Sequence, residues 1–249
     1  MNKTEREQLK HNEAADALVA ASSYLSQYGR LVGLAAVAVL LLVGSVAGYR
    51  AFKARTEERA QTQLASAVEI LNAPVAQPPA PGIAPAAPAA GTYASEAARA
   101  EAALKQLLAT ADGFGSTDAG MRARYYAAAL YAETNRAKEA GDLYTQVRDA
   151  AGASTLLGRM ASLGLASMQV RQKQFDPAIK SLQELAQRRD GPLPVDAVLV
   201  QLAEAYQQAG RGAEASQTLQ RVIDEFPQSP YAADARQRVE ALQATAKVS

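Results

Sequence analysis

The sequence contains no cysteine and no tryptophan, and its one histidine is His11. The absence of cysteine excludes disulfides, thiolate-ligated zinc or iron–sulfur sites, a thiol nucleophile and a lipid-modified N-terminal cysteine. A single histidine cannot build a histidine-based metal cluster. No Gly-x-Ser-x-Gly elbow occurs, and the glycine cluster Gly113–Gly120 (GFGSTDAG) follows no predicted strand and precedes no Gly-Lys-Ser/Thr. We therefore expect a non-enzymatic chain that holds no metal or cofactor.

Net charge and aromatic content are also low. The 26 basic and 25 acidic residues leave a formal charge of +1, and no window is basic enough for a nucleic-acid footprint. Aromatic residues make up 6% of the chain, whereas alanine and leucine are abundant. Alanine and leucine lose little free energy on entering a helix, so the composition predicts an all-α fold.

One long stretch lacks charge altogether. The nineteen residues Leu31–Tyr49 lie between Arg30 and Arg50 and include no charged side chain. As a helix this run would extend about 29 Å, close to the hydrocarbon thickness of a bilayer. Thirty mostly polar residues precede the run, which is too long for the basic leader of a cleaved signal peptide. We predict a transmembrane helix over 31–49, preceded by a cytoplasmic tail over 1–30.

The orientation of this helix is left open by the flanking charges. Arg30 is the only basic residue close to the N-terminal end, whereas four follow the C-terminal end: Arg50, Lys53, Arg55 and Arg59. The positive-inside rule alone would keep the C-terminal part in the cytoplasm. The rule weakens for long translocated domains, and about 200 residues follow the anchor.

A proline-rich segment separates two helical regions. Helical spacing of Leu64, Val68 and Leu71 predicts a membrane-proximal helix over 50–72. Six of the eleven prolines then fall in 73–91, and proline blocks a helix interior, so we predict an extended Pro/Ala-rich linker there. A helix over 96–111 is expected to pair with the membrane-proximal helix across it.

From 92 to 249 the pattern repeats. Three alanines, Ala140, Ala178 and Ala215, lie 38 and then 37 residues apart, each followed by apolar residues four and seven positions later. Another alanine precedes each of them by twelve positions: Ala128, Ala166 and Ala203. This spacing resembles the tetratricopeptide repeat (TPR), in which small residues let two helices of a hairpin approach closely. We predict a TPR-like α-solenoid over 92–249.

The third repeat fits the TPR pattern best. Tyr206 follows the first small residue, Gly210 suits a left-handed helix end, and Pro227 forces the next turn. The other repeats depart from it, since Gln169 replaces the tyrosine and Asn135 and Lys173 replace the glycine. A last helix from Ser229 and Pro230 to about Thr245 is expected to cap the solenoid.

In a TPR solenoid the first helices of the hairpins line a concave groove, which is the candidate protein-binding site. On this alignment the groove is apolar with aromatic and methionine content, and such surfaces suit extended apolar segments or a partner helix. The alternative is that these side chains mainly pack between neighbouring helices. The predicted groove residues are Arg122, Tyr125, Tyr126, Met160, Leu163, Val170, Val200 and Glu204.

The order of parts resembles the bacterial ancillary Sec-translocon subunits, which are membrane-anchored periplasmic TPR-like proteins. The resemblance is clearest over Leu163–Leu182 (LGLASMQVRQKQFDPAIKSL), and the proline-rich insert departs from the family pattern. It implies an inner-membrane protein with a periplasmic C-terminal domain, acting with the Sec translocon, periplasmic chaperones and exported clients. It carries over no catalytic residue.

Two other functions remain open. The basic cluster after the apolar run favours the same fold as a cytoplasm-facing adaptor for a soluble partner. The last repeat, Asp224–Arg236 (DEFPQSPYAADAR), is similar to those of envelope-assembly and cell-division coordinators.

Overall fold

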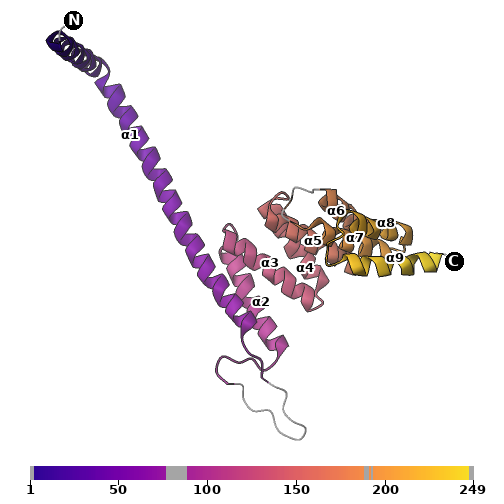
Figure 1. The fold of residues 1–249 in the computed structure, drawn as a ribbon. Coiled ribbons are helices and arrows are strands. Elements are labelled where there is room, and N and C mark those ends of the chain that lie inside the picture. Colours follow the sequence, from indigo (N-terminus) through magenta and orange to yellow (C-terminus); the bar gives the residue numbers. More distant parts are fainter. Residues whose placement is uncertain (1–2, 77–88, 188–190, 192, 247–249) are drawn as a thin grey trace. The chain divides into compact units, whose positions relative to one another are not determined.

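The computed structural model describes residues 3–76, 89–187, 191 and 193–246, with side chains from residue 29 onward except 32 and 246. These residues form helices with one isolated bridge and no longer strand (Figure 1). The helices are α1 (Lys3–Asn72), α2 (Glu96–Gly113), α3 (Asp118–Glu133), α4 (Ala137–Ala151), α5 (Leu156–Arg171), α6 (Phe175–Gln187), α7 (Val195–Gln208), α8 (Gly212–Glu225) and α9 (Ala232–Ala246). The predicted all-α class is confirmed.

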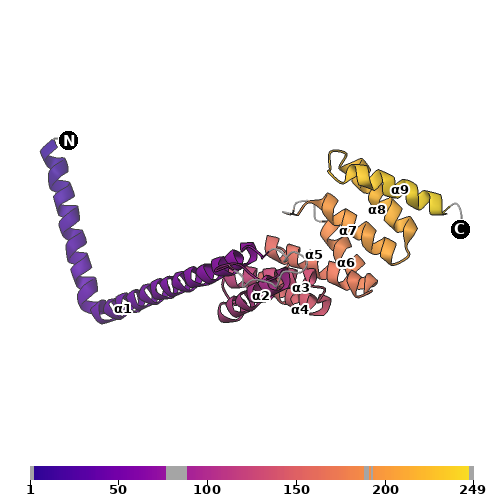
Figure 2. The ribbon, with the colours of Figure 1, turned by 90° about the horizontal axis from the view of Figure 1, so that it is seen from below.

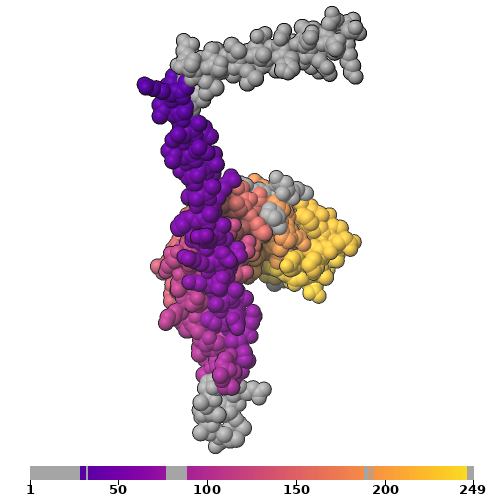
Figure 3. Space-filling model, turned by 90° about the vertical axis from the view of Figure 1, so that its left-hand side faces the viewer, coloured from indigo at the N-terminus to yellow at the C-terminus, as the bar shows by residue number. Residues whose placement is uncertain are grey.

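The chain forms two compact units, Met1–Arg55 and Thr56–Ser249, and α1 runs through both. The first unit contains the apolar stretch of α1, which is long and apolar enough to cross a membrane. No part of that apolar window is buried, and the described part of the segment is drawn in indigo in Figure 3. Leu34, Leu40 and Leu42 are each about two-thirds exposed.

The second unit is a stack of antiparallel helical hairpins. Each helix from α2 to α9 packs against the next one along the chain, and α7, α8 and α9 lie side by side (Figures 1 and 2). Two hydrophobic cores run through the stack, one from the end of α1 to α5 and the other from α5 to α9. Helix α5 contributes Ala161 to the first core and Ala166 to the second, so it joins them. The predicted TPR-like solenoid is confirmed.

Alanines mark the positions where paired helices touch. The six alanines of the sequence alignment are all fully buried: Ala128, Ala140, Ala166, Ala178, Ala203 and Ala215. Larger side chains fill the space beside them, and Leu182, Leu199 and Leu219 are at most 1% exposed. Burying one such leucine contributes about 1.5–3 kcal/mol, so the hairpins are held mainly by these contacts.

The turns between the helices of three hairpins share one geometry. The N–H of Arg136, Gln174 and Arg211 each donates to the carbonyl five residues earlier at 2.8 Å. The preceding residues Asn135, Lys173 and Gly210 have φ of 61°, 60° and 75°. This is the Schellman arrangement, in which a left-handed residue closes the helix. The three positions that the TPR alignment assigned to glycine therefore adopt the expected backbone.

Repeats one and three share a further contact that repeat two lacks. The Arg136 guanidinium lies 4.3 Å from the ring centre of Tyr131, and that of Arg211 lies 4.8 Å from Tyr206. Each arginine also pairs with a glutamate three residues later. In repeat two Gln169 takes the tyrosine position, and its buried Oε1 has no hydrogen-bond partner among the residues that the structure describes.

The end of α1 is the first helix of the stack. Ala60 and Ala67 are fully buried, and Leu64 packs into the core that Leu104 and Leu107 of α2 help to form. This is the predicted pairing of the membrane-proximal helix with the helix after the linker.

A carboxylate of α1 also caps a more distant helix. Glu57 accepts the N–H groups of Asp118 (2.9 Å) and Ala119 (3.1 Å) at the first turn of α3. These donors have no partner within the helix, and the positive end of the helix dipole favours an anion there. The contact fixes the start of the second unit against α3.

The predicted linker over 73–91 lies largely outside the described residues, but its ends are described. Ala76 donates its N–H to the Tyr93 carbonyl at 2.8 Å, and Tyr93 donates to the Pro74 carbonyl at 2.9 Å. Arg99 also donates to the Ala73 carbonyl at 3.1 Å. The two ends of the proline-rich segment therefore meet at one place in the helical stack.

The final helix α9 covers the last hairpin. Ala235 and Val239 are buried in the second core, whereas Arg236, Gln237 and Glu240 are exposed. An outer face of this polarity is what the terminal helix of a solenoid requires. The predicted start at Ser229 is three residues early, since α9 begins at Ala232. Ser229 lies in the preceding turn, where its hydroxyl oxygen accepts the N–H of Tyr231 and its hydroxyl donates to Asp196 at 2.7 Å.

Replacing Lys173 by glycine should raise the free energy of unfolding by about 0.5–1 kcal/mol. The lysine Cβ is sterically strained in the left-handed region, whereas glycine is not. Part of this stabilisation is lost because glycine raises the conformational entropy of the unfolded chain. Urea unfolding of the full chain in mild detergent, followed by far-ultraviolet circular dichroism, measures the change. The control Gly210→Ala should lower the same quantity by about 1 kcal/mol, and destabilisation by Lys173→Gly would contradict the turn assignment.

Candidate functional site: an inner groove

Two neighbouring cavities open along the first helices of the hairpins, α3, α5 and α7. The larger holds about 410 Å³ and the smaller about 200 Å³. Ser167, Arg171 and Gln201 line both cavities, so the two form one continuous groove, here called the inner groove. The larger cavity is lined by Tyr125, Ala132, Glu133, Tyr144, Met160, Leu163, Gly164, Ser167, Met168, Arg171, Leu193 and Gln201. The smaller is lined by Ser167, Val170, Arg171, Leu182, Gln201, Glu204, Ala205 and Gln208.

Tyrosines form one end of the inner groove. The ring of Tyr125 meets that of Tyr144 edge-to-face, with centroids 5.5 Å apart and planes at 62°. On its other side Tyr125 meets Tyr126 at 6.1 Å and 69°. Tyr126 is 41% exposed, so the cluster reaches from the groove wall to solvent. Edge-to-face pairs are favourable ring contacts, so they hold the rings in fixed positions at this end of the groove.

Gly164 determines where the Tyr144 ring lies. A Cβ added to Gly164 would stand 2.5 Å from Cζ of Tyr144 and 2.7 Å from its two Cε atoms. The ring of α4 therefore packs directly on the backbone of α5. Together with Met160 and Leu163, this gives the larger cavity a wall of apolar carbon and sulfur.

The Tyr144 hydroxyl stays protonated at neutral pH. Burial raises the pKa of Tyr144 to about 12, with smaller upward effects from Tyr125 and Glu133 and a downward effect from Arg171. Burial also raises the pKa of Tyr125, and Tyr126 adds to this effect. Both phenols are therefore neutral groups that can donate one hydrogen bond.

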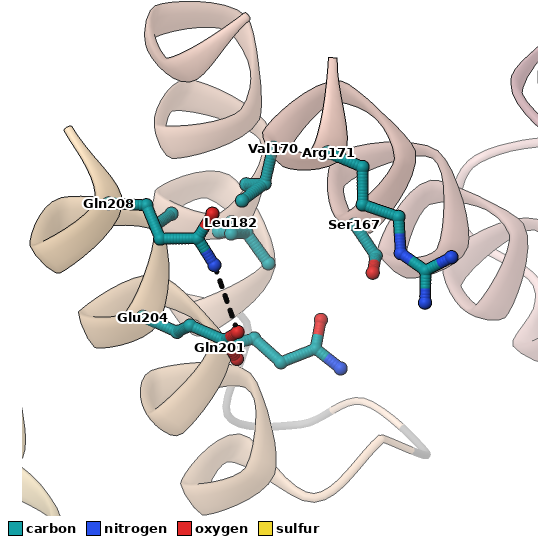
Figure 4. A pocket seen from close by; sticks show the side chains of 8 residues that line it. Ser167, Val170, Arg171, Leu182, Gln201, Glu204 and Gln208 are labelled. Atoms are coloured by element: carbon teal, nitrogen blue, oxygen red, sulfur yellow. Dashed lines mark hydrogen bonds between the residues drawn. The ribbon is translucent and has the colours of Figure 1, made fainter. Parts of the chain in front are cut away.

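The other end of the inner groove is polar. Gln201, Glu204 and Gln208 recur at helical spacing on α7, and they face Ser167 and Arg171 of α5 (Figure 4). The Nε2 of Gln208 donates to Oε1 of Glu204 at 3.1 Å. Val170 and Leu182 supply the apolar part of this smaller cavity. We call this end the amide half and the tyrosine-lined end the tyrosine half.

Arg171 lies where the two halves join. Its Nη1 donates to the carbonyl of Ala132 at 2.7 Å, close to the C-terminal end of α3. A cation is favourable there because the last carbonyls of a helix carry partial negative charge. The guanidinium has five N–H donors, so others remain available to a ligand.

The inner groove presents side chains of several chemical kinds. They offer apolar surface, neutral hydroxyls, amides, two carboxylates and a guanidinium. Throughout the part of the chain that the structure describes, no three histidine, cysteine, aspartate or glutamate residues are grouped to hold a metal ion.

Five of the eight predicted groove residues line the inner groove: Tyr125, Met160, Leu163, Val170 and Glu204. Tyr126 lies beside it through its contact with Tyr125. Arg122 is exposed on α3 and lines neither cavity, and Val200 packs against the second core instead. The role of these residues in protein binding stays a prediction.

Sequence reasoning missed several groove residues. Gln201 and Gln208 lie three before and four after Glu204, so helical spacing could have found them. Tyr144 is the apolar residue four positions after Ala140, and the repeat pattern does not assign it to the groove. Its contact with Gly164 depends on how α4 packs on α5, which no local pattern encodes.

Known proteins match the chain through its repeats. Residues 22–190 match the family described as "Tetratricopeptide repeat-like domain", and residues 169–239 match "Tetratricopeptide repeat". Two crystal structures of nearly identical TPR-like repeats, from a Podosopora anserina protein classed as a kinesin light chain, are similar in fold. One has 16% identity, covers 78% of this chain and 98% of its own, and gives a TM-score of 0.53. The other also has 16% identity, covers 78% of this chain and 99% of its own, and gives a TM-score of 0.50. No curated protein matches the chain.

Replacing Gly164 by alanine should lower the free energy of unfolding by about 1–3 kcal/mol, because the new methyl group must push the Tyr144 ring away. Gly141→Ala on α4 is the matched control, since its added Cβ meets nothing closer than 3.7 Å and alanine favours a helix. The control should be neutral or stabilising by up to about 1 kcal/mol in the same urea titration. Equal effects of the two substitutions would contradict the packing described here.

Proposed function

Because the chain belongs to the tetratricopeptide repeat-like domain family, we propose that it is a membrane-anchored scaffold whose solenoid binds protein segments outside the cytoplasm. The observation that carries the proposal is helix α1, which is at once the apolar, exposed candidate span and the first helix of the stack. One helix thus connects a bilayer to a binding groove. The proposed role is non-catalytic.

The proposed anchor is the segment 31–49. Its large side chains are exposed, including Leu31, Leu40 and Val43, and Arg30 and Arg50 stand at its two ends. Exposure of such a stretch to water is unfavourable by a free energy of about 25 cal/mol for each Å² of apolar surface. In a bilayer the same side chains meet lipid, and the helix satisfies its own backbone hydrogen bonds.

The proposed binding site is the inner groove. It is open to solvent through Tyr126, Glu133 and Gln208, and it combines apolar and hydrogen-bonding side chains without the paired basic residues that would clamp a terminal carboxylate. TPR-like domains generally bind protein partners, so the groove is the natural place for one.

The more specific form of the proposal rests on the resemblance over Leu163–Leu182. By that resemblance the chain is an ancillary subunit beside the Sec translocon of a bacterial inner membrane, with its solenoid in the periplasm. Its partners there would be the translocon, periplasmic chaperones and exported clients. The similarity of Asp224–Arg236 to envelope-assembly and cell-division coordinators supports a related role at the same membrane.

A second candidate is a cytoplasm-facing adaptor with the same fold. Its support is the basic cluster after the apolar run, Arg50, Lys53, Arg55 and Arg59, whereas Arg30 is the only basic residue in the roughly 20 positions before the run. The positive-inside rule retains such a cluster in the cytoplasm. Under this alternative the inner groove would serve a soluble cytoplasmic protein.

Protease added to intact spheroplasts of the host should digest the solenoid of a C-terminally tagged chain, because the proposal exposes that domain on the outer side of the membrane. Loss of the tag on immunoblots, with a cytoplasmic marker protein intact, is the expected result, and crosslinking to the translocon would then test the finer assignment. Survival of the tag until the cells are lysed would reject the periplasmic assignment and favour the cytoplasmic adaptor.

A further inference from the structure

The inner groove carries two carboxylates that form no ion pair among the described residues. Glu133 lines the tyrosine half and Glu204 lines the amide half, and within the described part of the chain neither lies within ion-pair distance of a basic side chain. Other glutamates of the solenoid, such as Glu139 and Glu214, are paired with arginines. Arg171 is the one basic side chain lining the described groove, so the groove is left with one net negative charge. A cationic ligand group complements it.

The amide half matches the hydrogen bonding of a polypeptide main chain. The Gln201 amide offers two donors and an acceptor, and Gln208 offers a second donor and an acceptor besides its bond to Glu204. Across the groove, Ser167 adds a hydroxyl and Arg171 adds guanidinium N–H groups other than the one bonded to Ala132. An extended main chain presents N–H and C=O groups in alternation, and groups of both kinds would find partners between α5 and α7. These contacts do not depend on the side chains of the ligand.

The tyrosine half forms a pocket that can accommodate an apolar side chain. Tyr125, Tyr144, Met160 and Leu163 line it, and the Gly164–Tyr144 contact keeps the ring against α5. A cavity of about 410 Å³ is large enough to accept an aromatic or branched aliphatic side chain. Methionine adapts its shape, so such a wall can accept several apolar residue types.

We infer that the inner groove takes an extended polypeptide segment with an apolar side chain in the tyrosine half, its main chain along the amide half, and a lysine or arginine beside Glu204. This inference rests on the proposed protein-binding function and names the class of segment bound. It predicts little preference for sequence beyond one apolar residue and one nearby cation.

Fluorescence anisotropy with the full chain in nanodiscs tests the inference. The probes are short labelled Gly/Ser-rich peptides with one phenylalanine and one lysine, placed from about two to about six residues apart to sample the extended length of the groove. Matched peptides carry glutamate in place of lysine, or serine in place of phenylalanine. The lysine peptide should bind about fivefold or more tightly than the glutamate peptide at low salt, and the difference should shrink as salt is added.

The charge swap Glu204→Lys is the decisive variant. It should reverse the order of the two peptide affinities, so that the glutamate peptide binds more tightly than the lysine peptide. Glu240→Lys, on the exposed face of α9, is the matched control and should leave the order unchanged. Circular dichroism of each variant verifies folding. An unchanged order in Glu204→Lys, or equal binding of both peptides to the unaltered chain, overturns the inference.

Leu163→Asp separates this inference from the proposed function. It places a charge in the tyrosine half and should abolish binding of every phenylalanine peptide, whatever the second residue. If Leu163→Asp removes binding but Glu204→Lys does not change the charge preference, the groove binds peptides and only the inference fails. If Leu163→Asp binds as well as the unaltered chain, or no peptide binds at all, both the groove assignment and the inference fail.

Discussion

Close approach of paired helices at alanine positions is the constraint on which the whole solenoid depends. Ala128 and Ala140, Ala166 and Ala178, and Ala203 and Ala215 are all fully buried, two in each hairpin. A larger residue at any of them would force helices apart in an interior packed as densely as an organic crystal. Because the hairpins stack on one another, displacement of one would change the spacing of α3, α5 and α7, and that spacing shapes the inner groove.

The repeats could be read from the sequence because each depends on short-range patterns. The alanine spacing identified the hairpins, and the need for a left-handed residue identified the turns at Asn135, Lys173 and Gly210. The same logic found one wall of the inner groove, since Met160 and Leu163 follow from helical spacing on one helix. The contacts that sequence reasoning missed join distant segments. Glu57 caps a helix 61 residues away, and Tyr144 meets Gly164 only through the packing of α4 on α5.

The groove described here has two chemical halves, which an alignment of apolar positions alone could not reveal. Tyr125, Tyr144, Met160 and Leu163 line the tyrosine half, whereas Gln201, Glu204 and Gln208 make the other half polar. This division matters for binding because apolar contact contributes most of the free energy, whereas paired hydrogen bonds and charges decide orientation and selectivity.

Site-specific photo-crosslinking in the living host tests most directly whether the inner groove is where polypeptides bind. A photoreactive residue would replace Ser167, which lines both cavities, or Ser181 of α6, which lines neither. The account predicts crosslinks to other polypeptides from position 167, removed by the additional change Leu163→Asp, and none above background from position 181. Equal crosslinking from both positions, or crosslinks from 181 alone, would contradict it.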